Sequence, residues 1–139
     1  MGIILDSSLL IAAERQRFKA TEFFSAHSGE RFYLAAISVA ELLHGVERAT
    51  PQKRAARAAI VEHFFSVLEV IDYDASVARQ HAILWATLAR TGKLIGPHDM
   101  LIAATALLHG HKLATLNRVE FCQVPKLKLV DVASYESDD

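Results

Sequence analysis

The segment GPHDMLIAATALLHGHKLATLN, residues 96–117, predicts a helix that is followed at once by a buried strand. Proline is favoured at the first helical position, which places the start of the helix at Pro97. Gly110 is suited to end it, because glycine adopts the left-handed conformation that often closes a helix. The short apolar run that follows, residues 112–116, reads as a strand, and the polar Asn117 comes directly after it.

The same alternation of strands and helices extends over the rest of the chain. Short apolar runs predict strands at residues 3–5, 32–37, 67–71, 112–116 and 128–130. Helical patterns fill the intervals at residues 8–15, 18–27, 39–48, 52–65, 74–90 and 97–109. Strands separated by helices pair in parallel through right-handed crossovers, so we expect an α/β fold: a three-layer α/β/α sandwich with a central, mainly parallel sheet.

Composition indicates a single domain over residues 1–139, with residues 132–139 as a frayed acidic tail. The chain has no apolar run near the ~20 residues that a membrane helix needs, and its N-terminus lacks the pattern of a secretory signal. Its only cysteine, Cys122, has no partner for an internal disulfide, so we expect a cytoplasmic protein. The net charge of -1 excludes a uniformly basic nucleic-acid binder, and such binding would need a local basic patch or a metal ion.

Four polar residues fall where the predicted sheet would bind a ligand. In open parallel sheets, ligands sit beyond the carboxyl ends of the strands. Asp6 and Asn117 directly follow predicted strands, Glu41 lies in the first turn of the helix after the second strand, and Asp99 opens the helix at Pro97. We therefore expect these four side chains to gather at one edge of the sheet.

Each of the four also has a purely structural interpretation. Asp6 has the residue type of a helix N-cap, and Ser38 with Glu41 matches a capping box. Asp99 suits the first turn of a helix, and Asn117 suits a turn. Together, however, three close carboxylates would repel one another unless a cation neutralised them. Oxygen ligands of this kind suit Mg²⁺, with Mn²⁺ as a substitute, and such a site favours phosphodiester hydrolysis by a metal-activated water.

The same residues lie in segments that resemble a known family. Residues 4–8, 38–47, 96–104 and 115–121 are similar, in order and spacing, to the four signature blocks of VapC toxins, which are PIN-domain ribonucleases. Residues 68–74 resemble a further block between the second and third. The resemblance covers residues 3 to about 131. It implies a PIN fold, a homodimer, a cognate VapB-type antitoxin and Mg²⁺-dependent endonucleolytic cleavage of a specific RNA, as the toxin of a type II toxin–antitoxin system.

By motif position, the resemblance makes Asp6, Glu41 and Asp99 the acidic, catalytic metal-site residues. Asn117 takes the fourth catalytic position, where many PIN domains have Asp. An amide orients water but is no base, so the site has one negative charge fewer unless Glu120 contributes. This departure leaves the number of metal ions, one or two, open.

The resemblance also points to supporting residues. Ser8 and Thr115 are similar to hydroxyl positions that hydrogen-bond to the acidic site, although a helix start and a strand explain them equally well. His98, beside Asp99, has the chemistry to donate to a phosphate. No pair of histidines has the spacing of a zinc site.

Two surface interpretations concern contacts with RNA. The densest basic group could hold RNA phosphates or be a solvated helix face; its members are Arg48, Lys53, Arg54 and Arg57. Tyr73 and Trp85 could stack on bases, but the apolar neighbours of Trp85 favour packing in a core or a dimer interface.

Two alternatives to this function stay open. One is another PIN-like nuclease, such as a flap nuclease or a factor in ribosomal RNA processing. The other, of a different class, is a metal-free PIN-fold binding module that acts only through a partner. VapC-like toxins cut tRNA or a ribosomal RNA loop, and similarity within a subgroup points to initiator tRNA.

Overall fold

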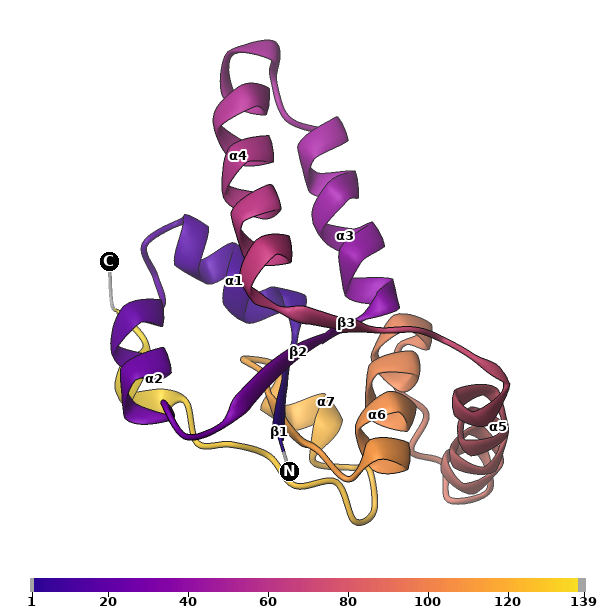
Figure 1. Ribbon diagram of the computed structural model, residues 1–139. Helices are drawn as coiled ribbons and strands as arrows, with labels where there is room; N and C mark the ends of the chain where they lie inside the picture. The colour runs from indigo at the N-terminus through magenta and orange to yellow at the C-terminus, as the bar shows by residue number, and fades with distance from the viewer. Residues whose placement is uncertain (1, 138–139) are drawn as a thin grey trace.

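The computed structural model describes residues 2–137 and contains a four-stranded parallel sheet (Figure 1). The strands are β1 (Gly2–Leu5), β2 (Arg31–Ala35), β3 (Glu69–Ile71) and β4 (Lys112–Ala114), in the spatial order β3-β2-β1-β4. All three pairings are parallel, with Ile4 opposite both Tyr33 and Leu113. The predicted parallel sheet is therefore confirmed.

Helices cover both faces of this sheet. The longer helices are α1 (Ser7–Glu14), α2 (Ala20–Ala26), α3 (Ala36–Glu47), α4 (Pro51–Val67), α5 (Ala75–Arg90) and α6 (Pro97–His109). Because side chains alternate along a strand, β1 contributes to two cores: Ile3 and Leu5 pack with α1 to α4, and Ile4 packs with α5 and α6. The three-layer α/β/α sandwich is thus confirmed. Gly110 ends α6 with φ +70°, as predicted.

The junction between β2 and α3 differs from the prediction. We expected a strand over residues 32–37 and a helix from residue 39, but the strand ends at Ala35 and the helix begins at Ala36. The chain passes from strand to helix without a loop, so Ser38 lies inside the first turn and is buried. The Ser38–Glu41 capping box is therefore wrong, and Glu41 lies in the second turn.

Three further boundaries were wrong. The third strand begins at Glu69 because α4 continues to Val67, and β3 is largely exposed because it is an edge strand. The fourth strand ends at Ala114. Instead of a strand over residues 128–130, the described chain has a single parallel bridge between Leu113 and Leu129.

Two short helices in the last part of the chain were missed. One is α7 (Arg118–Phe121), which buries Phe121 completely, and the other is a 3-10 helix at Ala133–Tyr135. We expected residues 132–139 to fray, but Val132 is buried and the ring of Tyr135 meets that of Phe23 edge-on, with 5.4 Å between centroids. Residues 138–139 of the expected tail lie outside the described residues.

The structure also bears on Trp85 and on membrane insertion. Trp85 is 56% exposed and stacks on His81, so packing in this chain's own core is excluded. Across residues 2–137, every helix is too short or too polar to span a membrane.

Candidate active site

The candidate site lies where the order of the strands reverses. From β1 the chain adds β2 and β3 on one side, and β4 then pairs with the other side of β1. Ligands in parallel sheets bind at such a reversal, beyond the carboxyl ends of the strands. Asp6 follows β1, Asn117 lies three residues after β4, and Asp99 lies in the first turn of α6.

Asp6 is buried and is held by two hydroxyl groups. The side chains of Ser8 and Thr115 donate to its Oδ2 atom over 2.8 Å and 2.7 Å, and its backbone N–H donates to the carbonyl of Ala114. Asp6 occupies the N-cap position of α1, but its carboxylate makes no capping hydrogen bond within residues 2–137. Its carboxylate therefore contacts the side chains of Ser8 in α1 and of Thr115 directly after β4, not the backbone of its own helix.

The same two hydroxyls connect Asp6 to the segment after β4. Ser8 Oγ accepts the N–H of Leu116 at 3.2 Å, and Thr115 Oγ1 accepts the N–H of Asn117 at 2.9 Å. Thr115 is fully buried. The structure thus brings both predicted hydroxyl residues to Asp6, and their hydrogen bonds fix the carboxylate relative to Asn117.

Glu41 reaches the site from α3. Ser7 Oγ donates to its Oε1 atom at 3.1 Å, and His98 Nδ1 lies 3.3 Å from its Oε2 atom. His98, which we considered for its position beside Asp99, therefore contacts Glu41. Sequence reasoning missed Ser7, although its place directly after Asp6 was the available signal.

Asp99, Asn117 and Glu120 form a second group of side chains. The amide nitrogen of Asn117 donates to Asp99 Oδ2 at 3.1 Å and to Glu120 Oε2 at 2.6 Å. Glu120 also accepts the N–H of Gly96, the residue that precedes α6. Glu120 thus lies beside Asp99 and contributes the extra carboxylate that the sequence left open.

The charges of this group shift two pKa values in opposite directions. Burial, the hydrogen bond with Glu120 and the negative charges of Asp6, Glu120 and Glu41 together raise the pKa of Asp99 to about 7. The hydrogen bonds from Asp99, Gly96 and Asn117 lower the pKa of Glu120. A proton on Asp99 therefore relieves the repulsion of the four carboxylates.

The donor chemistry fits a hard cation. Burial and the neighbouring carboxylates raise the pKa of Asp99, and a divalent ion would stabilise such a group of carboxylates. Among residues 2–137, however, no three His, Cys, Asp or Glu side chains are grouped as closely as the ligands of one ion. Mg²⁺ commonly binds one or two carboxylates and keeps its other water ligands, so a site with few direct protein ligands suits it.

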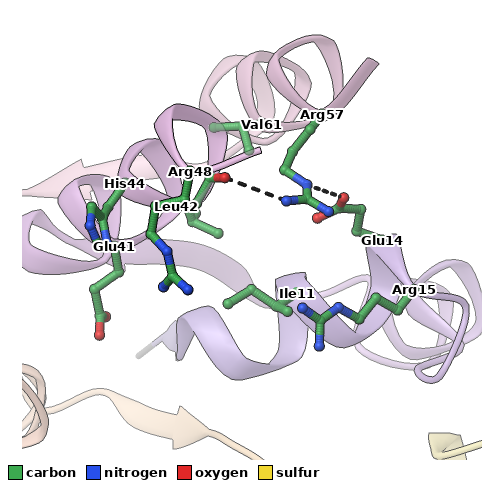
Figure 2. Close-up of a pocket in the computed structure, with 10 residues that line it drawn as sticks. Ile11, Glu14, Arg15, Glu41, Leu42, His44, Arg48, Arg57 and Val61 are labelled. Carbon is green, nitrogen blue, oxygen red and sulfur yellow. Dashed lines mark hydrogen bonds and ion pairs between the residues drawn. The ribbon is translucent and has the colours of Figure 1, made fainter. Parts of the chain in front are cut away.

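The predicted basic group lies on the neighbouring helices α3 and α4, but its members make different contacts. Arg57 pairs with Glu14 at 2.7 Å, and Arg54 donates to the backbone carbonyls of Glu47 and Ala49. Lys53 is exposed in the first turn of α4. Arg48 lines a cavity that also contains Glu41, and Arg57 lies at the border of this cavity (Figure 2).

Sequence comparisons place the chain among nucleases. Residues 3–127 match the model of the PIN domain family. "Ribonuclease VapC1" of Rickettsia felis is 35% identical over 96% of this chain and 98% of its own length. "tRNA(fMet)-specific endonuclease VapC" of Salmonella typhimurium is 37% identical over 73% of this chain and 75% of its own length.

Structural comparisons agree. The chain superposes on a subunit of the VapBC complex of Salmonella typhimurium bound to DNA, with a TM-score of 0.84, 30% identity and coverage of 94% of this chain and 98% of that one. The VapBC2 complex of Rickettsia felis, bound to a DNA fragment of its promoter, gives a TM-score of 0.85 and 26% identity, with the same coverage.

Proposed function

The chain belongs to the VapC ribonucleases of the PIN-domain family, and on this premise we propose that it is a Mg²⁺-dependent endoribonuclease and a toxin that cuts a structured RNA. Membership in this family confirms the resemblance drawn from the sequence blocks. The observation that carries the proposal is that Asp6, Asp99 and Asn117 make their side-chain hydrogen bonds to other site residues. Helix capping does not account for these bonds.

Asp6, Glu41 and Asp99 would hold the ion directly or through water, and Mn²⁺ would substitute for Mg²⁺. The bound ion would lower the pKa of a water molecule and stabilise the charge that develops on phosphorus. Ser8 and Thr115 would keep the Asp6 carboxylate in one orientation, as their hydrogen bonds support. Attack by water in line with the scissile bond would leave a 3′-hydroxyl and a 5′-phosphate.

The amide of Asn117 would act as a fixed donor between two carboxylates. It keeps Asp99 and Glu120 close to each other without adding a third negative charge. When the cation binds, the proton on Asp99 would leave, because metal ligands must be deprotonated. The role of Asn117 is therefore to orient the acids.

For the substrate, we propose initiator tRNA, with other tRNAs or a ribosomal RNA loop as the alternatives. The Salmonella relative that is named as specific for tRNA(fMet) supports this choice. For partners, we propose a VapB-type antitoxin and a second copy of the chain in a homodimer, in the cytoplasm. The VapBC assemblies of the Rickettsia and Salmonella relatives support the antitoxin.

The first test is RNA cleavage by the purified protein, freed of antitoxin, on total bacterial RNA and on an initiator tRNA transcript. We expect discrete new 5′ ends with Mg²⁺ or Mn²⁺ that disappear with EDTA and in Asp6→Asn. The control Asp72→Asn changes an exposed aspartate after β3 and should cleave normally. Intact RNA with folded wild-type protein would favour a metal-free binding module, and a 2′,3′-cyclic phosphate would exclude attack by water.

A further inference from the structure

Three hollows adjoin one another around Ile11 of α1, next to the acidic residues. The first is a cavity of about 240 Å³ that contains Glu41 at one side. The second is lined by Ser7, Glu41 and His98, and the third by Ser8, which donates to Asp6. Ile11 lines all three hollows, Glu41 lines the first two, and Ser8 connects the third to Asp6 through its hydrogen bond.

Two arginines point into the first of these hollows. Arg15 occupies the C-cap of α1 and Arg48 the C-cap of α3, and Figure 2 shows their guanidinium groups in the space on either side of Ile11. Both side chains line the cavity, and both residues are exposed. Arg15 also lines the third hollow, together with Arg17.

These two guanidinium groups have no acidic partner in the described part of the chain. Within residues 2–137, neither Arg15 nor Arg48 forms an ion pair, whereas Arg57 at the border of the same cavity is paired with Glu14. The Arg57–Glu14 pair joins α4 to α1 and closes one side of the cavity (Figure 2). The cavity therefore carries positive charge beside a negative centre, in a chain whose net charge is only -1.

We propose that Arg15 and Arg48 together bind one phosphate of the RNA backbone beside the bond that is cleaved. This inference rests on the proposed function, since it takes RNA as the substrate. Guanidinium groups match phosphate oxygens with paired hydrogen bonds, and two of them on one cavity suit a single phosphodiester group. Such a contact would offset the repulsion between the RNA backbone and the four carboxylates. Of the basic group predicted from the sequence, the proposal uses Arg48, and a role of the other three members in RNA binding stays a prediction.

The test measures RNA binding separately from cleavage. Fluorescence anisotropy with a labelled single-stranded RNA of about 20 nucleotides, in EDTA and over a range of KCl, would compare the wild type with Arg15→Gln, Arg48→Gln and the double variant. The matched control is Arg90→Gln, an exposed arginine at the end of α5. We expect each test variant to bind roughly 3- to 10-fold more weakly, and the salt slope of the double variant to fall by about 0.7, the value for one phosphate contact of a single strand. Arg90→Gln should bind as the wild type does.

Unchanged affinity and salt slope in the folded double variant would overturn the inference, and normal Mg²⁺-dependent cleavage by the wild type would still support the proposed function. Conversely, arginine-dependent binding by a wild type that never cleaves RNA would support the phosphate site and refute the nuclease. A third probe is an acidic peptide of similar charge. Loss of peptide binding with unchanged RNA binding would overturn the inference in favour of a protein partner.

Discussion

Replacement of Asp99 by Asn should stabilise the metal-free protein at alkaline pH. The folded-state pKa of Asp99 is raised from 3.8 to about 7, so the folded state resists its ionisation. A group whose pKa is raised by folding contributes its full stability below the unfolded pKa and loses it as the pH rises through the folded pKa. The wild type should therefore lose stability between about pH 4 and pH 7, and Asp99→Asn, which does not titrate there, should not.

The size of the effect follows from the shift. At 1.36 kcal/mol per pKa unit, the wild type would lose at most about 4 kcal/mol of unfolding free energy as the pH rises. Because Asp99 is only partly buried and solvent screens its neighbours' charges, we expect a loss of about 1–2 kcal/mol. Urea unfolding in EDTA at pH 5 and pH 8 would measure the difference between the two proteins. Asp72→Asn is the control for removing an exposed aspartate.

Two results would refute this reasoning. One is a stability difference between wild type and Asp99→Asn that does not grow with pH, which would mean that neither burial nor the neighbouring carboxylates oppose the ionisation of Asp99. The other is a stability difference between the wild type and Asp72→Asn that grows with pH by the same amount. Saturating Mg²⁺ should remove the alkaline destabilisation of the wild type, because the cation replaces the proton.

Three further predictions concern single contacts. Thr115→Val keeps the shape of a buried side chain but removes its hydrogen bonds to Asp6 and to the N–H of Asn117. It should lower the free energy of unfolding in urea by about 1–3 kcal/mol and reduce cleavage, and Thr115→Ser is the control. Asn117→Asp replaces a shared donor by a third acceptor, so it should lower the melting temperature in EDTA and increase the rise in melting temperature on adding Mg²⁺. A melting temperature in EDTA equal to that of the wild type would contradict this. Tyr135→Ala should cost about 1–2 kcal/mol through lost contacts with the rings of Phe18 and Phe23, whereas a frayed tail would give no change.

The order of strands and helices could be predicted because periodicity and end signals are local. Pro97 and Gly110 set the limits of α6 correctly, since both act through their own backbone angles. The junction after β2 could not be predicted, because Ser38 has the residue type of a cap and only the direct passage from strand to helix places it inside α3. Helix α7 was missed because tertiary packing, not a local pattern, forms it: its four residues are helical where Phe121 fills the core.

The site was partly predictable because strand ends are predictable. Asp6 and Asn117 follow two strands, β1 and β4, that pair in parallel. A parallel sheet alone therefore places both residues at the same edge. The pairing of Glu41 with Ser7 and His98 depends on the position of α3 relative to α1 and α6, which no local pattern reports. Arg15 was missed for a similar reason, since its cavity is built from three helices.

Asn117 and Glu120 explain how a PIN-type site keeps its charge without an aspartate at the fourth position. The three-residue spacing of Asn117 and Glu120 places both side chains at the start of α7, where the amide donates to Glu120 and to Asp99 at once. An aspartate at position 117 would add charge but remove the donor that holds the two acids together. The amide instead brings Glu120 to the site, and the hydrogen bonds that lower the pKa of Glu120 keep it ionised while Asp99 carries the proton. Under the proposed function, a divalent cation would displace the proton on Asp99 and would bind where Asn117 already orients two carboxylates.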